Sequence, residues 1–137
     1  ISLERVNEFK VNLPLNHYKR AVFTSEENQR TLKAVDYLKN EDVVQLGNLL
    51  YSSHEGLRDL YEVSCKELDF LVDFTTNISS VKGARMMGGG FGGCTLNIVK
   101  EDYVDLFIND ISQAYLEKFN IKLTPHIVKT SNGAKVL

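Results

Sequence analysis

Apolar side chains recur every three or four positions through the first 80 residues, which is the spacing of one face of an α-helix. This spacing predicts a short helix before Pro14 and one long helix over about 18–39. It predicts two further helices, over about 41–59 and 65–79. The N-terminal part of the chain is therefore expected to be helical.

Two of these helices carry capping signals at their starts. Asn40 is a residue type that caps helix N-termini, so it is expected to cap the 41–59 helix. Ser64 and Glu67 have the spacing of a capping box, which predicts that the next helix begins at Cys65.

The periodicity changes after the last of these helices. Residues 83–87 have the pattern of a short strand, and residues 94–99 alternate apolar and polar side chains with the period of two that is typical of a half-buried strand. Helical spacing returns over 104–119, and Asn120 is expected to end this helix.

The chain is predicted to finish in β-structure. A third strand is expected over 122–129, at a sheet edge because Pro125 cannot donate to a ladder, followed by a turn at 131–133 and a short strand over 134–137. Helices followed by a β-loop-β-α-β-β order predict an α+β fold, a two-layer sandwich with helices against an antiparallel sheet, in one domain over 1–137.

The composition fits a single globular domain and gives no indication of a nucleic-acid-binding, membrane-spanning or secreted protein. The chain has 137 residues, 43% of them hydrophobic and 25% charged, which is enough for a real core. A net charge of −2 gives no indication of nucleic acid or an anionic membrane as partner. No apolar stretch reaches the roughly 18 residues of a membrane span, and no signal peptide is predicted.

The cysteines and histidines do not form a recognisable site. Cys65 and Cys94 are interpreted as reduced, mostly buried thiols of a cytoplasmic protein. The three histidines lack metal-ligand spacing to each other and to the cysteines: His17, His54 and His126. No metal site is predicted.

Five of the nine glycines fall within six consecutive positions, and these form the main candidate site. The run is Gly88, Gly89, Gly90, Phe91, Gly92 and Gly93. It matches the G-x-G-x-x-G spacing, but a dinucleotide-binding turn must open a helix, and here a strand follows. A Walker A loop would end in Gly-Lys-Ser/Thr, whereas this one ends in Gly-Gly-Cys.

Two interpretations of the glycine loop (residues 88–93) remain on these grounds. It is either a mobile hairpin turn or a backbone wall whose amides form a nest for an anion or a substrate. Arg85 and Met87 are candidates for loop support, although strand alternation allows Arg85 to point to either face. A charged cluster near residue 60 is interpreted as solvated surface: Arg58, Asp59 and Glu62.

The string from Gly83 to Cys94 resembles the third motif of the galactokinases, a branch of the GHMP small-molecule kinase family. Residues 57–69 resemble a second galactokinase segment, as do Ser53-His54 and the stretches 18–21 and 132–136. The resemblance covers essentially the whole chain.

The resemblance implies the C-terminal domain of a two-domain cytoplasmic enzyme, α+β with a ferredoxin-like core. Galactokinases transfer the γ-phosphoryl group of ATP, with Mg²⁺, to the C1 hydroxyl of galactose. The catalytic Asp and Arg, the main ATP phosphate loop and most Mg²⁺ contacts belong to the N-terminal domain. This chain is therefore expected to hold no catalytic or metal-binding residue and to be inactive alone. The loop would lie near the sugar and the transferred group.

Three positions depart from the family pattern. Met87 replaces a common Thr, Lys66 replaces a Pro in the first turn of a helix, and Leu60 replaces a common Asp. The alternatives are a related GHMP kinase for N-acetylgalactosamine or arabinose, and a stand-alone ferredoxin-like binding module. The start at Ile1 rather than Met suggests a piece of a longer protein.

Overall fold

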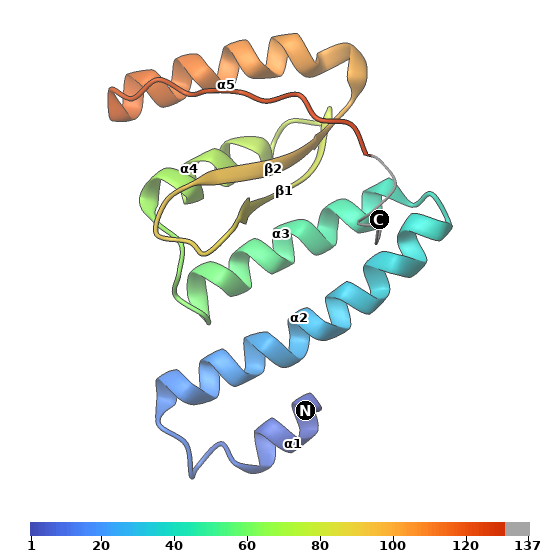
Figure 1. Ribbon diagram of the computed structural model, residues 1–137, viewed down its shortest axis with the longest axis vertical. Coiled ribbons are helices and arrows are strands. Elements are labelled where there is room, and N and C mark those ends of the chain that lie inside the picture. Colours follow the sequence, from blue (N-terminus) through green and yellow to red (C-terminus); the bar gives the residue numbers. More distant parts are fainter. Residues whose placement is uncertain (131–137) are drawn as a thin grey trace, which may run out of the picture.

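The computed structural model describes residues 1–130 and has helices packed on an antiparallel hairpin (Figure 1). The elements follow in the order α1 (Leu3–Glu8), α2 (Leu15–Lys39), α3 (Val43–Asp59), α4 (Lys66–Thr75), β1 (Val81–Met87), β2 (Cys94–Val99), a 3-10 turn η1 (Glu101–Tyr103) and α5 (Val104–Phe119). The predicted α+β class and all the predicted helices are confirmed.

The two strands form the sheet of the described residues. β1 and β2 pair antiparallel, with Met87 opposite Cys94 and Met86 opposite Thr95, and the register shifts between Val81 and Gly83. The glycine loop joins the paired ends of these strands. It is therefore a hairpin connection, as the strand pattern predicted.

Helix α3 lies unusually close to β1. A Cβ built on Gly47 would lie 1.7 Å from the carbonyl oxygen of Lys82, and one built on Gly83 would lie 2.4 Å from the Cα of Gly47. Only glycine permits such an approach of helix backbone to strand backbone. This contact fixes the strand that leads into the glycine loop.

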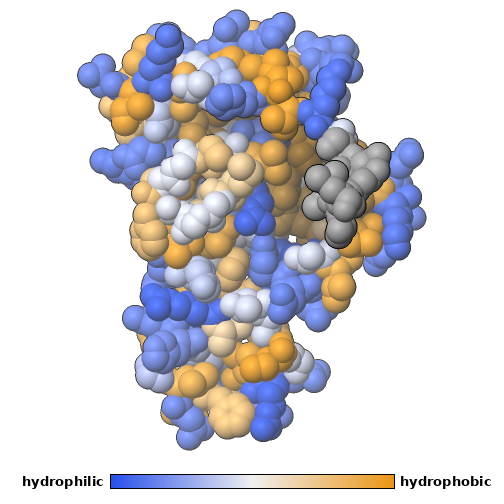
Figure 2. Space-filling model, in the orientation of Figure 1, coloured by the Kyte–Doolittle hydropathy of each residue, from blue (hydrophilic) through white to orange (hydrophobic). Residues whose placement is uncertain are grey.

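Two apolar clusters hold the layers together. Figure 1 shows α1, α2 and α3 below the hairpin and α5 above it. The cluster between α4, β1 and α5 consists of Leu71, Val81, Phe107, Ile111 and Tyr115. The cluster between α2, α3, α4 and β1 consists of Phe23, Leu57, Leu68 and Met86. On the face shown in Figure 2, apolar and polar residues are interspersed.

Both helix-cap predictions were wrong in detail. Asn40 ends α2, and the cap of α3 is Asp42, whose side chain accepts from Gln45 N. The two residues have equal capping chemistry, so the sequence could not choose between them. At α4 the Ser64 hydroxyl bonds the side chain of Asp69 instead of the helix backbone, so no capping box forms.

The third strand predicted over 122–129 is absent. Residues 121–130 pair with neither β1 nor β2, and Leu123 packs instead against the apolar cluster between α4, β1 and α5. A strand requires a partner as well as a suitable pattern, and the described residues supply none here. The turn at 131–133 and the strand over 134–137 lie outside the described residues. Within residues 1–130, no helix is long and apolar enough to cross a membrane.

Candidate functional site

The glycine loop has a backbone that few other residues could adopt. Gly88 and Gly90 both have φ of 87°, Gly92 has 139° and Gly93 has 103°, all in the region that favours glycine. Phe91 is the one loop residue with a side chain and also has positive φ, 58°. The positive φ values of this connection therefore explain why it contains so many glycines.

One side of the loop is docked on the segment that follows α3. The backbone N–H of Phe91 donates to the Val63 carbonyl at 2.7 Å. A Cβ on Gly90 would lie 2.1 Å from that same carbonyl oxygen, so the close approach requires glycine. By contrast, a Cβ on Gly88, Gly89 or Gly92 would meet nothing within 4 Å. The loop is thus held on one side and open on the other.

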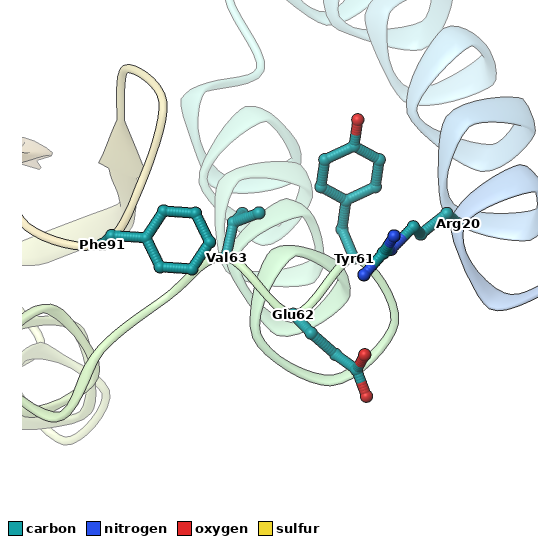
Figure 3. Close-up of a pocket in the computed structure, with 5 residues that line it drawn as sticks. All are labelled: Arg20, Tyr61, Glu62, Val63 and Phe91. Carbon is teal, nitrogen blue, oxygen red and sulfur yellow. The ribbon is translucent and has the colours of Figure 1, made fainter. Parts of the chain in front are cut away.

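A shallow pocket of about 240 Å³ lies beside the docked loop. Figure 3 shows its lining: Arg20, Tyr61, Glu62, Val63 and Phe91. The Phe91 ring points toward Val63, and the residue as a whole is 76% exposed. Lys19 Nζ lies 3.1 Å from a carboxylate oxygen of Glu62, which ties the segment after α3 to α2.

The Arg85 side chain bonds Glu27 on α2. Its Nη1 donates to Glu27 Oε1 at 3.0 Å, and Ser53 Oγ donates to the same oxygen at 2.6 Å. Arg30 Nε donates to Glu27 Oε2 at 2.7 Å. Burial acts to raise the pKa of Glu27, but the hydrogen bonds from Ser53 and Arg30 and the two arginine charges outweigh it and lower that pKa.

This cluster joins α2, α3 and β1 just before the glycine loop. Arg85 Nε donates to the Met86 carbonyl at 2.9 Å, so the guanidinium also fixes the end of β1. Met87 follows, with its side chain 50% exposed. Direct support of the loop by Arg85 and Met87 stays a prediction, because the contacts of Arg85 run to Glu27 and Met86.

His54 is a buried polar residue that the sequence analysis did not place in the site. Its side chain is 1% exposed, and Nδ1 accepts the backbone N–H of Met86 at 3.2 Å. Nε2 lies 3.3 Å from Asp69 Oδ1, a close polar contact that does not have the geometry of a hydrogen bond. Ser64 Oγ donates to the same carboxylate oxygen at 2.5 Å. We call these four residues, Met86, His54, Asp69 and Ser64, the His54 bridge.

The imidazole of His54 is neutral in this arrangement. Burial lowers the pKa of His54 below its ordinary value of 6.5, and the neighbouring carboxylate of Asp69 only partly opposes that effect. Because Nδ1 accepts a hydrogen bond, the ring proton belongs on Nε2, facing Asp69. The only sequence signal for His54 was its place in the Ser53-His54 pair.

The remaining candidates are consistent with structural roles. Arg58 pairs with Asp59 and Asp73 at 3.1 and 3.3 Å on the surface, in keeping with a solvated charge cluster. Both cysteines are free, as predicted, but Cys65 is half-buried and Cys94 exposed, so the prediction of burial was wrong. No group of three or more metal-ligating side chains occurs among residues 1–130.

Comparison with known proteins agrees with the resemblance in the sequence. The family model described as GHMP kinases C terminal matches residues 34–118. The chain is 47% identical to a galactokinase of Thermotoga neapolitana over 117 residues, covering 85% of this chain and 33% of that protein. A galactokinase of Clostridium acetobutylicum is 50% identical, over 85% of this chain and 30% of that protein.

A solved structure has the same fold. The crystal structure of Lactococcus lactis galactokinase complexed with galactose superposes with a TM-score of 0.84 at 34% identity, covering 89% of this chain and 32% of the other. The chain spans about a third of the length of the curated relatives that it matches. The fold, the glycine loop between its strands and these matches together show that the chain belongs to the GHMP kinase family, in the part described as C-terminal.

Proposed function

We propose that residues 1–137 are the C-terminal domain of a two-domain galactokinase, which transfers the γ-phosphoryl group of ATP to the C1 hydroxyl of galactose. One observation carries the proposal. In a chain whose relatives are galactokinases, the glycine loop is docked on one side and leaves backbone open on the other. A side-chain-free surface of this kind suits close contact with a sugar and a phosphoryl group.

The role of the loop is to complete one wall of the active site. Gly88, Gly89 and Gly92 leave room for a substrate next to the backbone, because nothing lies within 4 Å of a Cβ built on them. Phosphoryl transfer depends on positioning and on stabilising negative charge, and exposed amides can do both. Met87 has no hydroxyl, so the contact with the phosphoryl group is assigned to backbone amides.

The chemistry itself would come from the N-terminal domain. The described residues do not fit a magnesium cage, since they contain no cluster of three acidic or other ligating side chains. Mg²⁺ would arrive with ATP and be held mainly outside residues 1–130. The catalytic Asp and Arg that the family uses are likewise assigned to the N-terminal domain, and the enzyme to the cytoplasm.

The proposal is tested with the full-length protein. Purified enzyme should release ADP from MgATP in the presence of galactose, and residues 1–137 alone should not. Parallel assays with N-acetylgalactosamine and arabinose separate galactokinase from the related sugar kinases. A full-length protein that turns over none of the three sugars would contradict the proposal. Turnover by residues 1–137 alone would contradict the assignment of the catalytic residues to the N-terminal domain.

A further inference from the structure

The first attachment of the glycine loop depends on a side chain of α3. β1 enters the loop through Met86 and Met87, and the backbone N–H of Met86 donates to His54 Nδ1. Met86 is fully buried and His54 is 1% exposed, so water cannot replace either partner. A buried amide without its acceptor is costly, so this bond fixes the point where the strand becomes the loop.

The second attachment runs through the segment after α3. Phe91 N–H donates to the Val63 carbonyl, and the next residue, Ser64, donates its hydroxyl to Asp69 on α4. The same Asp69 oxygen lies 3.3 Å from His54 Nε2. The His54 bridge therefore links the strand that enters the loop, through Met86, with the segment on which Phe91 docks, through Ser64.

We propose that His54 and Asp69 are positioning residues for the glycine loop, holding its entry at Met86 and its docking site at Val63 in one fixed relation. This inference rests on the proposed function for its effect on phosphoryl transfer. His54 is buried, so it acts on the loop only through the residues that it contacts. The two positioning residues act by keeping the open amides of the loop where the transferred group requires them.

Two substitutions separate hydrogen bonding from packing. His54→Asn retains a side-chain oxygen near the place of Nδ1, so it still accepts from Met86. His54→Gln fills more of the volume and reaches toward Asp69 but lacks that acceptor. If His54 only fills space, Gln should preserve the protection and the activity better than Asn. If His54 positions the loop by accepting from Met86, Asn should preserve them better than Gln.

The experiment measures amide hydrogen exchange over residues 86–93 and steady-state kinetics of the full-length protein. For His54→Gln, which loses the acceptor for Met86 but still reaches toward Asp69, we expect exchange at Met86 to be about tenfold faster than in the wild type, and kcat to fall more than KM changes. His54→Asn should recover most of the protection at Met86 and most of kcat. Thr75→Val is the control, because it removes a buried hydroxyl that bonds Tyr51 and Val72 and not the loop.

Ser64→Ala provides a second, milder variant should the His54 substitutions fail to fold. It removes only the link from Asp69 to the Val63 segment, so exchange should quicken at Phe91 and not at Met86. Unchanged exchange in Ser64→Ala and His54→Gln, or a better rescue by Gln than by Asn, overturns the inference. If the wild type lacks sugar kinase activity, the proposed function fails, while the exchange data still decide whether the bridge holds the loop.

Discussion

Replacing Gly90 by alanine should undock the glycine loop from Val63, whereas the same replacement at Gly88 should not. The two glycines have the same φ of 87°, so the positive φ would strain an alanine at either position. Their surroundings differ: nothing lies within 4 Å at Gly88, while the Val63 carbonyl oxygen would lie 2.1 Å from the new atom at Gly90. Comparing the two variants therefore separates the effect of backbone strain from the effect of the clash with the Val63 carbonyl.

The size of the difference follows from these distances. A side chain at positive φ costs about 1–2 kcal/mol at either position. At Gly90 the Cβ must also move away from a backbone oxygen, because real Cβ atoms stay at least 3.0 Å from such a neighbour. That movement breaks the bond from Phe91 N–H to Val63, worth about 0.5–1.5 kcal/mol. Gly90→Ala should therefore weaken docking by about 1 kcal/mol more than Gly88→Ala, or roughly fivefold in the docked population.

Hydrogen exchange at Phe91 reports the docked population directly. In the full-length protein, Gly90→Ala should raise the exchange rate at Phe91 about fivefold above that of Gly88→Ala, and it should lower kcat for galactose phosphorylation. Thermal unfolding would show that both variants remain folded. Equal exchange in the two variants would refute the reasoning, because it would mean that the approach to Val63 does not hold the loop.

Three further predictions concern stability of the full-length protein. Gly47→Ala should lower the free energy of unfolding by about 3 kcal/mol, since its Cβ would lie 1.7 Å from the Lys82 carbonyl oxygen, and an unchanged urea midpoint would contradict this. The pKa of Glu27 is lowered by folding, so its stabilisation is present above its ordinary pKa of 4.5 and lost as pH falls through the folded value. The melting temperature should accordingly drop more steeply below pH 4.5 in the wild type than in Glu27→Gln, and parallel profiles would oppose this. Asn120 has φ of 54°, so Asn120→Ala should lower the melting temperature while Asn120→Gly leaves it unchanged or higher; equal melting temperatures for the two would be contrary to expectation.

Local pattern predicted the elements well because each signal lies within one element. The apolar spacing identified α2 through α5, and the alternation at 94–99 identified β2 with its observed bounds. Five glycines between two strand patterns also indicated that the loop is special. Each of these inferences depends only on residues that are close together in the sequence.

Contacts between distant residues could not be predicted in this way. The partners in the His54 bridge come from α3, α4, β1 and the segment before α4, and no local pattern joins them. Arg85 could have faced either side of β1, and the choice is made by Glu27 on α2. The strand expected over 122–129 failed for the same reason, since pairing depends on a neighbour that the pattern does not contain.

The backbone contact between Gly47 and Gly83 limits how the molecule can move. Because Gly47 and Gly83 bring the backbones of α3 and β1 into direct contact, the strand cannot slide along the helix at this point without first lifting away from it. Freedom to move is left to the part of the loop that is not docked, where nothing lies within 4 Å of a Cβ built on Gly88, Gly89 or Gly92. The hairpin therefore combines strands that α3 holds in place with a loop that is docked on one side and open on the other.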